Sequence, residues 1–388
     1  MRLKKAAVGL SLLVSACASS GQIGDIKPGE EPKLNSVEAG LRMKMDEAER
    51  SFAASALIIK DLELQGYLED MVCRLAEEVC PDIRLYIVKI PYFNASMAPN
   101  GVMQVWTGLM LRIENEAQLA TVLAHELAHY KKRHAVKKWN SARNTGDFLA
   151  FFSIVTGGLG YGVVGLAAGL GAAGSIQAYS RDLETEADEI GQDYLNDAGY
   201  DPAEAARLWK KIKGEADAGD RETTAIFFAS HPAAEDRVRN LEARAEDYPE
   251  RPLQMRRDDN ERFRAVVDTR WQGWVKDLID TGSYEETLFV INGLEERNFD
   301  PAVLAFYRGD VYRRRSDEGD LDKAKVAYLK AAASEEATAK TYKNLGLVAK
   351  RQKEDGKAIE YFEIYLARYP QASDRFLVES YIKQLRES

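Results

Sequence analysis

Apolar residues recur at helical spacing in the middle of the chain, just before a histidine-rich segment. Residues three and four apart share one face of an α-helix, and the apolar face here consists of Leu119, Val122, Leu123 and Leu127. Asn115, with Gln118 three residues later, is typical of a helix start. The pattern therefore predicts a helix that begins directly after Asn115.

Beyond Pro252 the pattern changes to short helical segments that recur about every 34 residues, a period typical of tetratricopeptide repeats. In the clearest copy, YKNLGLVAKRQKEDGKAIEYFEIYLARYP, the matching positions are Leu345, Gly346, Ala358, Phe362 and Pro370. An earlier copy with an insertion has Gly309, Tyr312, Gly319, Ala324, Tyr328 and Ala331 in the same frame. A degenerate copy runs over 271–301, and ASDRFLVESYIKQL would cap the stack. We expect residues 258–388 to form an α-solenoid that binds protein segments, the alternative being a helical bundle with accidental spacing.

Composition and charge limit the class of protein. The 388 residues are 45% hydrophobic and 30% charged, as in a soluble globular chain with more than one domain. The net charge is -9, and the longest basic cluster, 131–138, is short. Because binding to phosphates needs a concentrated basic surface, nucleic acid is excluded as a partner.

The N-terminus reads as an export signal. Basic residues precede a short apolar run, 6–14, that is too short to span a bilayer. The run ends in VSAC, which resembles the bacterial lipobox, so residues 1–16 are predicted to be a lipoprotein signal peptide and Cys17 the lipidated residue; the alternative is a plain signal peptide. Ala18, where inner-membrane lipoproteins carry aspartate, implies by resemblance an outer-membrane lipoprotein that faces the periplasm. Residues 17–38 are predicted to be a flexible tether.

Two further cysteines would lie in this oxidising compartment. Within one helix, Cys73 and Cys80 would be separated by about 10 Å along the axis, too far for a disulfide. Pro81, however, indicates a chain break just after Cys80, which would let Cys80 fold back onto Cys73. The sequence leaves both a disulfide and two buried free thiols open.

The segment HELAH carries the first candidate chemistry. His125 and His129 are four residues apart and share one helical face, so both imidazoles reach one ion, while Glu126 is turned by about 100° and stands beside it. With a third protein ligand and a water, this arrangement is typical of catalytic zinc. The ion would lower the pKa of the water from ~15.7 toward ~7, and Glu126 would take its proton as the water attacks an amide carbonyl.

The third ligand must come from elsewhere in the chain. A histidine six residues past His129 is missing, since that position is Ala135, and 148–180 contains no acidic residue. The next acidic helix is SRDLETEADEIG, in which Glu184 and Asp188 share a face. Glu184 is predicted as the third ligand. Asp188 would orient a histidine ligand or transfer a proton to the leaving amine. The alternative is an acidic face exposed to solvent.

Three segments together resemble a known family. HELAH, SRDLETEADEIG and SHP at 230–232 are similar to motifs of the gluzincin peptidases that include HtpX, the mitochondrial Oma-type protease, the CAAX prenyl endopeptidase and the periplasmic BepA group. The resemblance covers roughly residues 39–248. In the family pattern ExEAD the first glutamate ligates zinc, which maps to Glu184. The resemblance implies an α+β, mostly helical chain, with a zincin-like metalloprotease domain and a small sheet at 39–250, followed by the α-solenoid.

The resemblance also assigns a strand and a histidine. Residues 94–110 are similar to the family segment that forms an edge strand before the zinc helix, and VMQVWTG alternates as a strand does. The backbone of Met103, Gln104, Val105 and Trp106 would then bind extended, unfolded substrates. His231 matches a histidine that can occupy the open position of zinc in BepA-like proteins and keep the enzyme latent; otherwise it is a packing residue. We expect His134 to be structural.

The segment 148–180 has no charged residue and is rich in glycine. Its length alone suggests a membrane span. A single crossing would put His125 and Glu184 on opposite sides of the bilayer, and two crossings need about forty residues plus a turn. We therefore expect a pair of short helices that forms a lid or touches a membrane face.

Together these features predict a zinc-dependent endopeptidase with one Zn²⁺ per chain. Resemblance to the BepA group implies a periplasmic, outer-membrane lipoprotein that degrades misfolded outer-membrane proteins or assists their assembly. Its partners would be unfolded or misassembled polypeptides, the membrane through the lipid anchor and, through the repeats, the outer-membrane assembly machinery. The rival interpretations are a repeat-based chaperone or scaffold with a structural or latent zinc domain, and a zinc hydrolase with a non-peptide substrate.

Overall fold

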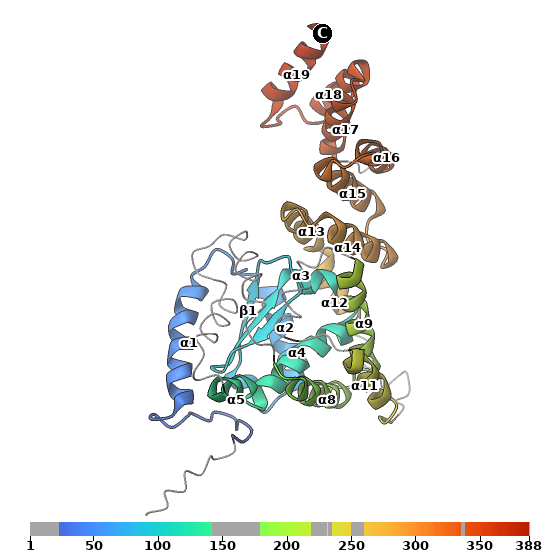
Figure 1. Cartoon of the computed structure of the whole chain (residues 1–388). Coiled ribbons are helices and arrows are strands. Elements are labelled where there is room, and N and C mark those ends of the chain that lie inside the picture. Colours follow the sequence, from blue (N-terminus) through green and yellow to red (C-terminus); the bar gives the residue numbers. More distant parts are fainter. Residues whose placement is uncertain are drawn as a thin grey trace, which may run out of the picture.

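The computed structural model describes residues 23–141, 179–218, 231, 235–249, 260–334 and 338–387. The described part is mostly helical with one small sheet, as predicted (Figure 1). The expected signal peptide 1–16, the lipidation site Cys17 and residues 148–178 of the apolar segment lie outside the described residues. Among the helices that the structure describes, none combines the length and the apolar character needed to span a membrane.

A three-stranded sheet stands beside the helices that carry the histidines. Its strands are β1 (Arg84–Val88), β2 (Ala95–Met97) and β3 (Val102–Trp106), in the order β1-β3-β2. β3 pairs in parallel with β1 and antiparallel with β2, and all five of its residues are buried. The prediction that Met103–Trp106 form an edge strand is therefore wrong. A segment with one polar residue among five is typical of a central strand covered on both faces.

Helices surround this sheet and form the rest of the body. α1 (Val37–Ala53) flanks β1 on one side in Figure 1, and α4, which runs next to β2, lies at the centre of the helices. The described helices of the body are α1, α2 (Leu62–Leu75), α3 (Thr107–Arg112), α4 (Glu116–Lys131), α5 (His134–Ser141), α8 (Arg181–Asp197), α9 (Ala203–Ala218) and α11 (Glu235–Ala245). α4 is buried on nearly every side because α2, α8, α9 and β2 all pack against it.

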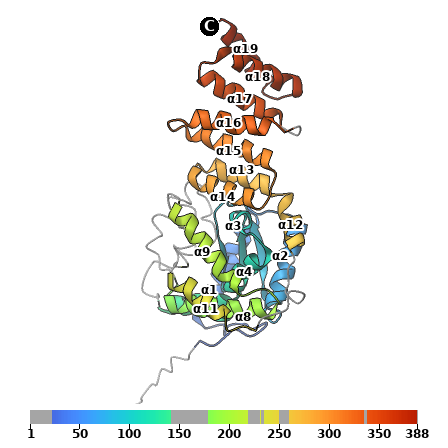
Figure 2. The same ribbon diagram turned by 90° about the vertical axis from the view of Figure 1, so that its right-hand side faces the viewer.

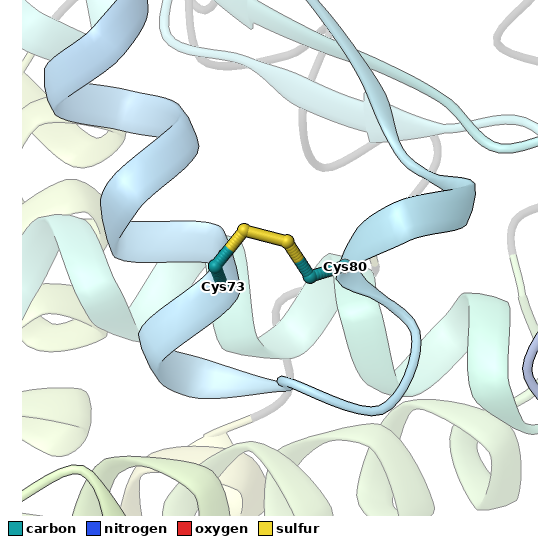
Figure 3. The surroundings of a disulfide bond; sticks show 2 residues. All are labelled: Cys73 and Cys80. Atoms are coloured by element: carbon teal, nitrogen blue, oxygen red, sulfur yellow. A yellow bond between two sulfur atoms is a disulfide. The ribbon is translucent and has the colours of Figure 1, made fainter.

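A disulfide joins Cys73 to Cys80 (Figure 3). α2 ends at Leu75, and the chain turns before the short 3-10 helix η1 (Cys80–Asp82) that carries Pro81. The turn brings the two Cα atoms to 4.8 Å, within the range of a disulfide. Of the two alternatives that the sequence left open, the structure therefore has the bridge.

The expected tether is described from residue 23 to 38; residues 23–36 lie against the body instead of extending freely, and residues 37 and 38 begin α1. Ile26 is 5% exposed, and its backbone N–H donates to the carbonyl of Lys131 at 2.8 Å. Asp25 pairs with Lys132, and Glu30 pairs with Arg133. Polar composition alone indicated flexibility, whereas a single buried isoleucine and these charges hold the segment in place.

In the part of the chain that the structure describes, eight helices follow the body and form an extended array (Figures 1 and 2). They are α12 (Asn260–Asp268), α13 (Trp271–Asp280), α14 (Tyr284–Glu296), α15 (Pro301–Arg315), α16 (Asp320–Ala332), α17 (Ala339–Arg351), α18 (Asp355–Arg368) and the last, α19 (Arg375–Glu387). α15 packs on α16 at Gly309, where a Cβ would lie 2.6 Å from the ring of Tyr328. α17 packs on α18 in the same way, through Gly346 and Phe362. The two hairpins thus repeat one contact.

The apolar core of the body continues into the first helices of this array. One cluster of buried residues extends from α2 and the sheet to Trp271, Leu278, Ile291 and Val311. α13 and α14 both pack on α3, the helix that precedes α4. The helices on both sides of the predicted domain boundary, between residues 250 and 258, therefore share a single apolar core.

Candidate metal centre

α4 positions the first three candidate residues. The side chain of Asn115 accepts a hydrogen bond from the backbone N–H of Gln118 at 2.8 Å, the predicted helix start. From this start, His125 and His129 fall on one face, and each is 2% exposed. Glu126 lies between them and is as deeply buried.

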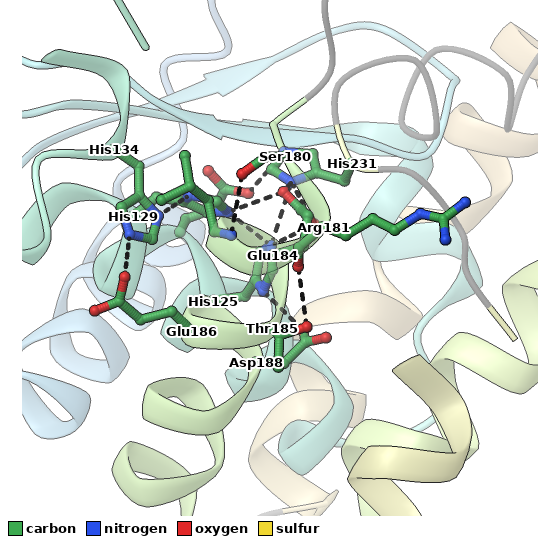
Figure 4. A network of polar contacts seen from close by, with 12 residues as sticks. His125, His129, His134, Ser180, Arg181, Glu184, Thr185, Glu186, Asp188 and His231 are labelled. Atoms are coloured by element: carbon green, nitrogen blue, oxygen red, sulfur yellow. Dashed lines mark hydrogen bonds and ion pairs between the residues drawn. The ribbon is translucent and has the colours of Figure 1, made fainter. Parts of the chain in front are cut away.

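α8 brings the acidic residues to the same place. Ser180 caps it by accepting from the N–H of Leu183 at 3.4 Å, as the sequence indicated. Gly191 lies against the backbone of His125, so the two helices approach each other closely. Glu184 and Asp188 both face α4 and are buried, whereas Glu186 reaches His134 at the edge of the cluster (Figure 4).

Four side chains converge between these helices. One ligand atom each of His125, His129, Glu184 and His231 lies within 4.8 Å of the others. Glu184 places its Oε2 3.5 Å from Nε2 of His125 and its Oε1 3.4 Å from Nε2 of His129. The structure thus brings together the three predicted ligands. His125 and Glu184, the first and the last of them, are separated by 59 positions in the sequence.

The donor atoms fit a divalent cation. Nε2 of His125 lies 3.0 Å from Nε2 of His129 and 3.2 Å from Nδ1 of His231. If these atoms were all unprotonated, their lone pairs would face one another, so a positive charge is needed between them. Three imidazole nitrogens and one carboxylate oxygen are the ligands that zinc prefers.

The pKa values of the clustered residues also favour a bound cation. Burial disfavours a charged ring, yet the carboxylates of Asp188 and Glu184 raise the pKa of His125 to about 9. Burial holds the pKa of His129 well below its usual value, so that ring is neutral at pH 7. Burial would raise the pKa of Glu184, but His231 and hydrogen bonds to the other histidines hold it well below normal. The centre therefore combines an ionised carboxylate with a preference for one added positive charge.

Glu126 stands at the side of the cluster. Its Oε1 lies 3.4 Å from Nε2 of His231 and accepts no hydrogen bond from the described residues. Burial raises its pKa, against the charges of His231 and His125. A buried carboxylate with a raised pKa and an unused acceptor is suited to take up a proton.

Asp188 lies behind His125. Its Oδ1 is 3.0 Å from Nδ1 of His125, and Arg237 binds both of its oxygens at 2.7 and 2.8 Å. Arg237 also contacts Glu184 at 2.9 Å and lies over the ring of Trp209. Of the two roles expected for Asp188, the geometry matches the orienting one. Proton transfer to a leaving amine is not supported, because both oxygens face protein groups on the far side of the His125 ring.

His231 lies inside the cluster. Its Nδ1 is 3.1 Å from Oε1 of Glu184, and its ring is 2% exposed. Among the two alternatives for this residue, the position matches that of an additional ligand. Arg237, six residues later on α11, pairs with Glu184 and Asp188 of α8.

Sequence reasoning missed three residues next to the cluster. His134, expected to be structural, is fully buried, and its Nδ1 lies 2.8 Å from Nδ1 of His129 (Figure 4). Its Nε2 lies 3.0 Å from Oε2 of Glu186. Tyr179 stacks on His129, with ring centroids 4.2 Å apart. The one available signal was that His134 follows His129 by five residues.

Comparison with known proteins adds independent information. The sequence profile of peptidase family M48 matches residues 59–245. The chain is 32% identical over 161 residues to the mitochondrial metalloendopeptidase OMA1 of Schizosaccharomyces pombe, which covers 41% of this chain and 45% of that protein. It is 27% identical over 222 residues to the beta-barrel assembly-enhancing protease of Escherichia coli K12, covering 54% and 45%. The corresponding protein of Yersinia pestis is 26% identical over 218 residues, covering 54% and 44%.

The profile match includes His125, His129, Glu184 and His231 and both helices, α4 and α8. The matches to the three relatives span less than half the length of each relative. The matched part of the chain extends from just before α2 to the end of α11, which is the body without α1. Residues 59–245 therefore match peptidase family M48, and this part of the chain is similar to known metalloendopeptidases.

Proposed function

We propose that this protein is a zinc-dependent endopeptidase that degrades misfolded outer-membrane proteins or assists their assembly. The convergence of His125, His129 and Glu184, with Glu126 beside them, carries the proposal. The names of the two bacterial relatives, beta-barrel assembly-enhancing proteases, support the process. The lipobox-like VSAC sequence supports an outer-membrane lipoprotein, anchored at Cys17, that faces the periplasm.

In this proposal His125, His129 and Glu184 hold Zn²⁺. A zinc ion there supplies a Lewis acid for the scissile carbonyl and a water that is acidic enough to react near pH 7. Asp188 stabilises the proton on Nδ1 of His125, which leaves Nε2 free to bind. Glu126 accepts a proton from the attacking water at Oε1 and passes it to the amide nitrogen of the leaving chain.

The substrate would be bound as an extended chain. Since β3 is central, β1 and β2 are the edge strands. The backbone of residues 57–59 covers part of β1 by hydrogen bonds from Ile59 to Ile87 and from Lys89 to Leu57. β2, which packs next to α4, is the edge that we propose for main-chain pairing with a peptide. Such pairing does not depend on side chains and suits unfolded substrates.

The helical array would bind protein partners. The contacts of Gly309 with Tyr328 and of Gly346 with Phe362 occupy the positions predicted for tetratricopeptide repeats. Small residues there allow the paired helices to approach each other. Such repeats bind protein segments on their concave surface, which supports the outer-membrane assembly machinery as a partner.

The variant Glu126→Gln tests the catalytic part of the proposal. We expect cleavage of an unfolded outer-membrane protein to fall about 100- to 10,000-fold, with unchanged zinc content. Glu189→Gln, on the exposed side of α8, is the control with the same chemical change and should cleave normally. If Glu126→Gln supports outer-membrane assembly in cells as well as the wild type does, the chaperone or scaffold interpretation is correct. If the wild type cleaves no polypeptide, a non-peptide substrate is indicated.

The variant His231→Ala tests latency. His231 fills the side of the cluster next to Glu126, where water and substrate would have to enter. We expect basal cleavage to increase several-fold when the ring is removed, because a ligand that blocks the open position is lost. Equal or lower activity at full zinc content would assign His231 to substrate positioning or to packing.

A further inference from the structure

His129 makes close contacts with both of its ring nitrogens. Nε2 faces Glu184 and His125 in the cluster, at 3.4 and 3.0 Å. Nδ1 faces Nδ1 of His134 at 2.8 Å, and Nε2 of His134 faces Glu186 at 3.0 Å. α4, α5 and α8 thus contribute one residue each to a continuous hydrogen-bonded chain that runs away from the cluster (Figure 4).

Only one arrangement of protons along this chain leaves His129 able to bind a metal ion. The carboxylate of Glu186 is an acceptor only, so the proton of His134 sits on Nε2 and is donated to Glu186. Nδ1 of His134 is then an acceptor, and it takes a hydrogen bond from Nδ1–H of His129. Nε2 of His129 is left with a lone pair that points into the cluster. With the opposite tautomer of His134, Nε2 of His129 would carry the proton.

The backbone between α4 and α5 holds His134 in place for this contact. Arg133 adopts a left-handed conformation, φ 55°, which is uncommon for a residue with a side chain. Its guanidinium pairs with Glu30 and Glu38, both at 3.3 Å, so contacts with the N-terminal part of the chain stabilise the turn. The turn directs His134 back toward His129. An unfavourable backbone conformation that persists is stabilised by its surroundings.

The two histidines of α4 are therefore supported differently. His125 has a carboxylate, Asp188, directly at Nδ1. His129 reaches its carboxylate, Glu186, only through the ring of His134. Asp188 is buried, whereas the side chain of Glu186 is 38% exposed and also lies 3.6 Å from Lys132.

We propose that His134 and Glu186 are positioning residues that fix the tautomer and the orientation of His129 and thereby set the affinity of the centre for its metal ion. The proposal rests on the metal site proposed above. Neither residue is a ligand, since both lie on the far side of the His129 ring. Because Glu186 is partly exposed and water can replace it, its removal has a smaller effect than removal of His134.

Zinc affinity, measured on the full chain by competition with a chelator of known affinity, tests this proposal without reference to catalysis. His134→Phe keeps a ring but removes the acceptor, and we expect about 10- to 100-fold weaker binding. His134→Asn keeps an acceptor close to the position of Nδ1 and should recover part of the loss. Glu186→Ala should weaken binding several-fold. Glu189→Ala, on the exposed side of the same helix, is the matched control and should bind as the wild type does.

The unfolding midpoint of each metal-free protein separates positioning from folding. If His134→Phe unfolds, the comparison of Glu186→Ala with Glu189→Ala decides, because both side chains lie at the surface of α8. Unchanged zinc affinity in a folded His134→Phe, or equal affinities of Glu186→Ala and Glu189→Ala, overturns the proposal. Failure of the wild type itself to bind zinc would instead overturn the metal site on which it rests.

Discussion

The body around the metal centre and the helical hairpins from α15 onward are stabilised in different ways. In the body, buried charged groups meet from distant parts of the chain: His125 on α4, Glu184 on α8 and Arg237 on α11. In the hairpins, the main buried contacts are apolar and join neighbours in sequence, such as Gly309 with Tyr328 and Gly346 with Phe362. Buried charges are costly unless they are paired. The stability of the body therefore depends on contacts among all its segments, whereas the stability of each hairpin depends mainly on contacts within it and with its neighbour.

The first helices of the array, α12 to α14, are stabilised by contacts with the body. Trp271 and Ile291 join its apolar core. Arg297, just after α14, donates to the carbonyls of Leu111 and Ile113 at the end of α3, and Asn260 accepts from the backbone N–H of Glu116 at the start of α4. Residues outside the range 59–245 thus contact both the end of α3 and the start of α4, the helix that carries His125 and His129. α15 joins the two regions, because its Val311 belongs to the apolar core of the body and its Gly309 packs on Tyr328 of α16.

Glu184→Ala is expected to have the largest effect, a loss of zinc affinity that is confined to the body. Loss of this carboxylate removes a ligand and leaves Arg237 with one partner fewer. Zinc affinity should fall by more than the roughly 100-fold typical of residues that only support a ligand, while the helix content of the array stays unchanged. Chelator competition and circular dichroism measure the two effects, and Glu189→Ala is the control. Full zinc affinity would mean that the three histidines suffice.

Removal of the disulfide is expected to have an intermediate effect, a loss of stability that is confined to the body. Cys73 and Cys80 close a short loop in the denatured chain, and replacing both by alanine should lower the free energy of unfolding of the body by about 2 kcal/mol. Urea unfolding followed by the tryptophans of the body measures this change. The same loss should appear when the wild type is reduced. Equal stability of the oxidised wild type and the double variant would contradict the prediction.

The smallest effect is expected in the hairpins. A Cβ at Gly346 would lie 2.5 Å from the ring of Phe362, so Gly346→Ala should destabilise the α17–α18 hairpin by about 1–2 kcal/mol. Gly356, in α18, has nothing within 4 Å of its Cβ position, and Gly356→Ala should be neutral or slightly stabilising. Hydrogen exchange of α17 and α18 measures the difference. Zinc affinity should not change in either variant; a change would show that the two regions are coupled.

Local features could be predicted from the sequence because they depend on neighbours in the chain. The capped starts of α4 and α8, the shared face of His125 and His129, and the small residues at Gly309 and Gly346 all follow from helical spacing. The shared face of Glu184 and Asp188 follows from the same geometry, and the structure brings Glu184 to the cluster. In each case a fixed rotation per residue decides which side chains share a face.

The sequence by itself determined the helices, their caps and the set of side chains available on each face. Only the tertiary structure decided that β3 is central in the sheet, that Cys73 and Cys80 are bridged, and that His134 links His129 to Glu186. These features depend on how segments far apart in the chain pack against one another. A strand pairs with whatever backbone lies beside it, and a buried histidine bonds to whichever acceptor its neighbours supply, so neither can be inferred from spacing along one element.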